Sequence, residues 1–445
     1  MNWLQEKINT FKKSRFVKDL MAMQFSSAFT RFLAVVASIV FARFLGAENY
    51  GLYALVFGFV AFSGAFMGME GGSVILILLP QAYQKKDKAE ITNIISYFIK
   101  INFLTSFVVG LLIIIIAPHI TTYLYHSSTI GNLARILILG MIITSFSEVL
   151  TLCLQSIRKI KILVTIESLS RILEILIPIT LVFLGFGLKG IVWGYFINNL
   201  LYFVIALTIY SAWTKRNPLL PKFSEIAKGF FAVKMKKYFN FGFLMLVDKK
   251  IASLYSNLSL MMLGIFVPAS VVGYFKLASK YISLTSVLTK PIANLLMVQL
   301  PKSIVTGARI FKDNLEKVSL YTLLLTLPVV GGMLVVGAFL VRLLYGAQYE
   351  PVIPLIYYLA FWPILSSYVI GVGASIRVLG LMKQSISVNS LVILLGLPIV
   401  YWLVKSYDVY GAVVALTVWN NIAAYIMFCL TRRHLKEKII QEQSV

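Results

Sequence analysis

The stretch IGNLARILILGMIITSFSEVLTLCLQSIRKIK, residues 130–161, decides the fold class of the chain. Its first part, 130–153, is a long apolar run with two charged residues, and the remainder carries three basic residues. An apolar run of about 20 residues is long enough to cross a bilayer as a helix. Lys and Arg gather in the short loops on the cytoplasmic side of a membrane. The stretch therefore predicts a membrane span followed by a cytoplasmic loop.

The same pattern recurs along the whole chain. Of the 445 residues, 59% are hydrophobic and 13% are charged, whereas soluble domains are about 45–50% apolar and about 25% charged. This composition excludes a soluble enzyme and a disordered chain. We predict an all-α integral membrane protein with about twelve transmembrane helices, at 24–46, 50–79, 92–117, 130–153, 162–185, 188–212, 239–264, 269–298, 318–344, 351–376, 386–404 and 409–430.

Basic residues give the topology of these spans. Of the 41 Lys and Arg residues, 28 lie in segments on one side of the predicted membrane, and only Lys189, Arg342 and Lys405 lie on the other side. The side rich in Lys and Arg is cytoplasmic, so both termini are expected there. The net charge of +24 therefore reflects topology and does not indicate a nucleic-acid partner. The external loops are too short for an extracytoplasmic catalytic domain.

An internal repeat divides the chain into two halves. LGAENYGLYAL (45–55) resembles LGIFVPASVVGYFKLA (263–278), QSIRK (155–159) resembles ASIRV (374–378), and GIVWGYFINNLLYFVI (190–205) resembles GAVVALTVWNNIAAYIMF (411–428). Six spans per copy is an even number, so the two bundles are parallel and pseudo-symmetric about a central cavity. Such repeats are typical of transporters that work by alternating access.

The predicted organisation has five parts. They are a cytoplasmic amphipathic N-terminal segment (1–23), an N-lobe (24–212), a basic linker (213–238), a C-lobe (239–430) and a cytoplasmic tail (431–445). The linker has apolar residues at helical spacing beside lysines, which is typical of a helix at the surface of an anionic membrane. The three histidines lack metal-ligand spacing and no Walker A loop occurs, so we expect no metal and no cofactor.

Cations inside the spans are the candidate binding residues, because a charge at bilayer depth is costly unless it lines a wet cavity or has a partner. Lys276 and Lys280 are four residues apart and share a helical face, where they repel unless water or an anion lies between them. Arg31 corresponds to Lys249 at an offset of 218 in the repeat. These four residues predict an anion-attracting cavity. For Lys276 and Lys280, pairing with Asp248 or another acidic residue is the structural alternative.

For other charged residues in the spans, the sequence gives weaker evidence of a functional role. Arg171 lies between Glu167 and Glu174 at spacings of four and three, which favours a local structural trio, although Arg171 stays a candidate for substrate binding. Among the acidic residues in spans, Asp248 and Glu70 are candidates for binding a coupling proton or sodium ion. The sequence alone does not choose between these ions.

Five stretches carry a resemblance to a known family. They are ARFLGAENYGLYAL (42–55), SIRK (156–159), VDKKIASLYSNLSLMMLGIFVPASVVGYFKLASK (247–280), QLP (299–301) and YGAQYEPVIPLIYYLA (345–360). With these stretches the chain resembles the polysaccharide flippases, of O-antigen and teichoic-acid type, in the multidrug/oligosaccharidyl-lipid/polysaccharide exporter superfamily.

The resemblance implies a substrate and a location. It implies movement of an undecaprenyl-pyrophosphate-linked oligosaccharide from the inner to the outer leaflet of a bacterial cytoplasmic membrane, with the embedded cations on the pyrophosphate. Anionic lipid and other polysaccharide-assembly proteins are the further partners to expect. Two alternatives remain open. One is a multidrug or cation antiporter of the same superfamily, although the excess of embedded cations argues against it because cationic substrates favour acidic residues in the cavity. The other is a membrane polysaccharide polymerase or ligase.

Overall fold

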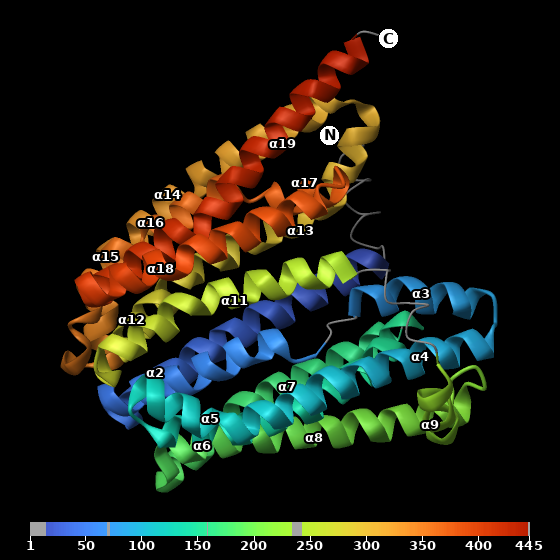
Figure 1. The fold of residues 1–445 in the computed structure, drawn as a ribbon, viewed down its shortest axis with the longest axis horizontal. Helices are drawn as coiled ribbons and strands as arrows, with labels where there is room; N and C mark the ends of the chain where they lie inside the picture. The colour runs from blue at the N-terminus through green and yellow to red at the C-terminus, as the bar shows by residue number, and fades with distance from the viewer. Residues whose placement is uncertain (1–14, 69–71, 158, 234–242, 444–445) are drawn as a thin grey trace, which may run out of the picture. The chain divides into compact units, whose positions relative to one another are not determined.

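The computed structural model describes residues 15–68, 72–157, 159–233 and 243–443, and all regular elements in these ranges are helices (Figure 1). The first half contains α2 (Arg15–Phe66), α3 (Gly72–Gln84), α4 (Lys88–Asn102), η1 (Phe103–Val108), α5 (Val109–Tyr125), α6 (Ser128–Ser156), α7 (Ile160–Leu181), η2 (Val182–Phe186), α8 (Gly187–Arg216) and α9 (Phe223–Ala232). The second half contains α11 (Phe243–Phe266), α12 (Ala269–Ile282), η3 (Ser283–Thr285), α13 (Ser286–Thr306), α14 (Ala308–Tyr345), η4 (Ala347–Tyr349), α15 (Val352–Leu359), α16 (Phe361–Tyr368), α17 (Val372–Val378), α18 (Met382–Val414), η5 (Ala415–Trp419) and α19 (Asn420–Gln443).

The helices have the length and surface of membrane spans. Eight stretches of the described residues are long and apolar enough to cross a bilayer. Large apolar side chains face outward on them, among them Val335, Leu394 and Leu184 with exposed fractions of 84%, 68% and 66%. Apolar side chains facing outward on helices of this length are typical of contact with lipid. The predicted all-α, multi-pass membrane protein is thereby confirmed, and the count of twelve spans stays a prediction.

Several of the eight stretches include more than one predicted span. Within these stretches a residue with positive φ breaks the helix where one predicted span ends and the next begins. Gly46 (φ 72°) is the last residue of the first predicted span, and Gly185 (φ 88°) is the last residue of the fifth. Glycine reaches this region without a Cβ clash. Asp408 (φ 49°) breaks α18 between the last two predicted spans, and Asp tolerates positive φ better than most residues.

Three predicted spans consist of separate helical segments. The predicted span 50–79 is divided because α2 ends at Phe66 and α3 begins at Gly72, with Gly68 at φ 63°. The predicted span 269–298 consists of α12, the 3₁₀ turn η3 and α13. The predicted span 351–376 consists of the three short helices α15, α16 and α17. Segmented helices are a feature of transporters, in which they line binding sites.

The chain forms two compact units. Unit 1 comprises Met1–Phe44, Phe66–Thr122 and Ser127–Phe243, and unit 2 comprises Leu45–Ala65, Tyr123–His126 and Leu244–Val445. Each has its own apolar core: that of unit 1 includes Ile91, Phe98 and Cys153, and that of unit 2 includes Phe311, Leu315 and Leu435. The units group residues by contact and not by membrane span, so the predicted lobe limits remain a prediction.

The basic linker contains a helix that belongs to unit 1 and packs within it. Helix α9 lies against α4, where Ser96 Oγ donates a hydrogen bond to the Ile226 carbonyl (3.3 Å). Lys88 Nζ lies 2.7 Å from Glu225 Oε1, which also ties the two helices together. The amphipathic helix expected in this linker is therefore present as α9. Residues 1–14 of the predicted N-terminal segment lie outside the described residues.

Candidate functional site

Lys276 and Lys280 lie one helical turn apart on α12 and are half-buried. Neither ammonium group has a hydrogen bond or an ion pair with any residue that the structure describes. Two like charges on one helical face repel each other, so this arrangement calls for an anion or water beside them. The predicted pair is therefore present on one face, without an internal neutralising partner in the described part of unit 2.

The backbone of α12 is held closely by its neighbours. Gly51 and Gly273 let α2 and α12 meet backbone to backbone, because a Cβ on Gly273 would lie 2.9 Å from the Ala47 carbonyl oxygen. Helix α15 packs against α12 as well. Small residues at a crossing allow this close approach in membrane proteins. Lys276 follows Gly273 by three residues, so the crossing fixes the helix that carries the cation.

Arg135, also embedded in a predicted span, has a structural role in unit 1. Pro118 lies inside α5 and has no N–H, so the carbonyl of Ile114 lacks its usual helical donor. Arg135 Nε donates a hydrogen bond to that oxygen (2.7 Å), and its Nη2 reaches the Ile115 oxygen (3.4 Å). The guanidinium thus satisfies the Ile114 carbonyl that the proline leaves open, and it makes a longer contact with the next carbonyl.

Three further embedded cations also have partners. Lys250 Nζ donates to the Gly64 carbonyl (3.0 Å) in the last turn of α2, where a cation suits the helix dipole. Arg171 Nη1 pairs with Glu174 Oε2 at 2.9 Å, which supports the structural reading of that trio. Lys100 Nζ lies 3.5 Å from the Val233 carbonyl. Lys276 and Lys280 differ from these four cations, because neither has such a partner among the residues that the structure describes.

Four predicted site residues are not characterised by the structure. The backbones of Arg31, Asp248 and Lys249 belong to α2 and α11, and their side chains lie outside the described part. Glu70 lies outside the described residues altogether. The binding roles predicted for Arg31 and Lys249, and the coupling roles predicted for Asp248 and Glu70, stay predictions.

Unit 2 contains a second feature, a pocket of about 380 Å³ between α11, α16, α17, α18 and α19. Aliphatic side chains form most of its wall, and Trp362 adds an aromatic ring. Ser385, Asn389 and Asn420 supply hydroxyl and amide groups. Asn389 Nδ2 donates to Ser385 Oγ at 3.3 Å. No charged side chain lines this pocket among the described residues, so it offers neutral hydrogen-bonding groups only.

The π-helix η5 positions one wall of this pocket. It ends at Trp419, directly before Asn420. Trp419 Nε1 donates to the Val392 carbonyl on α18 (3.1 Å), and Gly396 leaves room for the indole ring, because a Cβ there would collide with it. A π-helix adds a residue to the turn and occurs often at functional sites. Asn420 is therefore oriented by the contact between η5 and α18.

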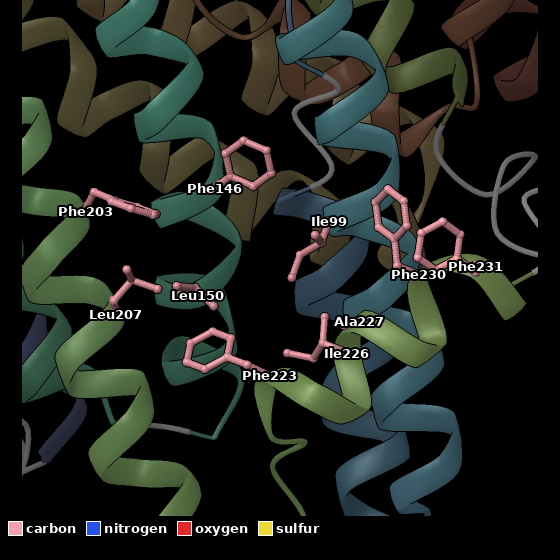
Figure 2. Close-up of a pocket in the computed structure, with 10 residues that line it drawn as sticks. All are labelled: Ile99, Phe146, Leu150, Phe203, Leu207, Phe223, Ile226, Ala227, Phe230 and Phe231. Carbon is pink, nitrogen blue, oxygen red and sulfur yellow. The ribbon is translucent and has the colours of Figure 1, made fainter.

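An apolar groove of about 380 Å³ lies in unit 1 beside the linker helix α9 (Figure 2). Figure 2 shows Ile99 of α4 and Phe230 of α9 on one side, with Phe146 of α6 and Phe203 of α8 across from them. All ten lining residues are apolar. A groove of this kind suits hydrocarbon and offers no polar group to a sugar or a phosphate.

The polar pocket was missed in the sequence because its signal is weak. Ser385 and Asn389 are four residues apart at the start of a predicted span, which is the spacing of one helical face. Asn420 lies in the repeat segment 411–428, where Asn420 and Asn421 match the two asparagines at 198–199, and this match gave no sign of a binding role. Uncharged polar residues inside spans form hydrogen bonds between helices, so they position a polar site without an embedded charge.

Comparison with known proteins identifies a matching family and solved structures with a similar fold. Residues 40–354 match the family described as polysaccharide biosynthesis protein. No curated protein sequence matches the chain. Among solved structures, an inward-facing multidrug resistance MATE family transporter of the MOP superfamily is similar with a TM-score of 0.70 and 16% identity, over 92% of this chain and 95% of that one.

Two further solved structures are similar to the chain. The lipid II flippase MurJ in an inward closed conformation has a TM-score of 0.67 and 15% identity, over 94% of this chain and 89% of that one. A MOP superfamily transporter from Pyrococcus furiosus has a TM-score of 0.61 and 14% identity, over 94% and 96% of the two chains. At these identities the likeness concerns the fold, which is that of membrane transporters. The family match covers well over half of the sequence, and the chain belongs to the polysaccharide biosynthesis protein family.

Proposed function

We propose that this protein flips a lipid-linked oligosaccharide, carried on undecaprenyl pyrophosphate, from the cytoplasmic to the outer leaflet of a bacterial cytoplasmic membrane. The observation that carries the proposal is the pair Lys276 and Lys280, two embedded cations without a described neutralising partner. A pyrophosphate supplies concentrated negative charge, and ammonium groups replace the hydration that it loses on leaving water. Membership of a polysaccharide biosynthesis family supports an oligosaccharide as the cargo.

The proposed cycle follows from the charge and the fold. The pyrophosphate binds at Lys276 and Lys280 from the cytoplasmic side, and the hydrophilic sugars enter with it while the polyprenyl chain stays in lipid. A change between inward-open and outward-open states then releases the headgroup to the outer leaflet. Both termini are cytoplasmic in this proposal, since the loops rich in Lys and Arg face that side. Asp248 and Glu70 are proposed as acids that couple the cycle to protons or sodium ions.

The rival proposal is a multidrug antiporter, to which a MATE transporter with the same fold gives support. Substrates of such a transporter that are cations would be repelled by Lys276 and Lys280. Susceptibility of a deletion strain to cationic drugs separates the two functions, because loss of a flippase leaves drug export unchanged.

A double substitution tests the proposed function. We expect Lys276→Ala with Lys280→Ala to abolish export of surface polysaccharide and to leave membrane insertion intact. Lipid-linked oligosaccharide then accumulates in the inner leaflet, where leaflet-specific labelling detects it. The matched control is Lys383→Ala with Lys436→Ala, which removes the same charge from two exposed positions of unit 2. Normal surface polysaccharide in the first double variant would reject the role of the pair.

A further inference from the structure

We propose that the polar pocket of unit 2, lined by Trp362, Ser385, Asn389 and Asn420, is a subsite for an uncharged sugar ring of the transported lipid. The inference rests on the proposed function and adds to it a place where the glycan is recognised, separate in chemistry from the cationic pair on α12. The pocket of about 380 Å³ is within the range of small-molecule sites, which starts at about 300 Å³.

The chemistry of the lining residues selects a neutral, hydroxylated ligand. An amide donates and accepts hydrogen bonds, and a hydroxyl does the same, so Asn389, Asn420 and Ser385 match the alternating donors and acceptors of a sugar. No carboxylate lines the pocket to attract a cationic drug, and no Lys or Arg lines it to hold a phosphate, among the described residues. The Trp362 ring adds an apolar face of the kind on which the C–H face of a sugar packs.

Asn420 has the arrangement of a binding residue. Its amide is half-buried, lines the pocket and makes no hydrogen bond with another described side chain or backbone group. A polar group at membrane depth without a hydrogen-bond partner costs free energy, which a ligand or water in the pocket offsets. The next residue contrasts with it: Asn421 is buried and donates to the Thr417 carbonyl of η5, one turn earlier (2.6 Å).

The position of Asn420 is fixed by neighbouring elements rather than left free. The Trp419 hydrogen bond to Val392 anchors the end of η5 on α18, the same helix that carries Ser385 and Asn389. The three polar groups therefore lie on two helices that are tied together. Binding residues held by packed elements keep their geometry, which is a requirement for discrimination between ligands.

Binding of two lipid probes tests this subsite. The full chain, purified in detergent, is titrated with undecaprenyl pyrophosphate and with undecaprenyl pyrophosphate carrying one neutral hexose. We expect Asn420→Ala and Trp362→Leu each to weaken binding of the glycosylated probe by about tenfold, the size of one or two lost neutral contacts. Binding of the bare pyrophosphate lipid stays as in the wild type. Asn314→Ala, which removes an exposed amide of α14, is the control and changes neither affinity.

The outcomes separate the subsite from the proposed function. If the wild type binds both probes and Asn420→Ala and Trp362→Leu bind the glycosylated probe as tightly as the wild type, the sugar subsite is wrong and the flippase proposal stands. Equal weakening of both probes by these variants also overturns the subsite, because a sugar contact cannot act on a lipid without sugar. If the wild type binds neither probe, the proposed function fails. Retained folding of each variant is checked by thermal unfolding, and Asn389→Ala replaces any variant that does not fold.

Discussion

The close crossing of α2 and α12 predicts that Gly273→Ala destabilises unit 2. A Cβ on Gly273 lies 2.9 Å from the Ala47 oxygen and 3.1 Å from the Gly51 nitrogen. Non-bonded heavy atoms of this kind prefer a separation of about 3.5 Å, so the two backbones must part by about 0.5 Å. Both neighbours are backbone atoms and cannot rotate aside as a side chain could. The two helices must therefore shift as bodies, and the packing beside Lys276 shifts with them.

Overpacking of this kind costs about 1–3 kcal/mol, and replacing a helical Gly by Ala returns up to about 1 kcal/mol. We therefore expect a net loss of about 1–2 kcal/mol, measured as a decrease of several degrees in the thermal unfolding midpoint in one detergent. Gly331→Ala on α14 is the matched control, since a Cβ there has no atom within 4 Å, and it should be neutral or stabilising. A Gly273→Ala protein as stable as this control would refute the tight crossing.

Two further predictions concern polar contacts in unit 1. Arg135→Leu leaves the Ile114 carbonyl without a donor, which should cost about 1–3 kcal/mol; thermal unfolding measures this loss, and Arg135→Lys should recover part of it. Hydrogen bonds from the Lys88 ammonium and then from the Lys222 N–H hold the pKa of Glu225 below its usual value. This stabilisation is complete above the unfolded pKa of about 4.3 and is lost as pH falls through the lower folded pKa. Glu225→Gln should therefore be less stable than the wild type at pH 7, and the difference should shrink as pH falls below the unfolded pKa and vanish below the lowered folded pKa; a difference in stability that does not depend on pH in the acidic range would contradict the pairing.

The spans were predictable because their signals are local. Apolar runs and basic loops are read residue by residue, and the breaks at Gly46 and Gly185 fall at the predicted turns. Pro354 and Pro363 indicate kinks in 351–376, but the positions at which this span divides into three short helices do not follow from the sequence. Proline removes a donor but does not by itself say whether the helix kinks or ends. That choice depends on which neighbouring elements satisfy the open carbonyl groups.

The roles of the embedded cations depend on contacts that the sequence does not encode locally. Arg135 is followed by no acid at helical spacing, and its partner is a carbonyl exposed by Pro118 on the preceding helix. Lys250 likewise finds the end of α2, far away in sequence. The Arg171 pair was predictable, because Glu174 lies three residues away on the same helix. Spacing thus identifies partners within a helix and misses those that packing brings together.

The energetics of the cations gives Lys276 and Lys280 their significance. Each charge at the bilayer depth predicted for this pair costs about 2.5–3.5 kcal/mol on insertion scales, so two cations without a partner among the described residues would cost roughly 5–7 kcal/mol. That sum rivals the whole stability of a typical folded protein, about 5–15 kcal/mol. Arg135 and Lys250 offset their cost through backbone carbonyls, whereas no described residue does so for the pair on α12. Under the proposed function, a bound pyrophosphate would offset the cost of both lysines at once, and it would do so only while the cargo is present.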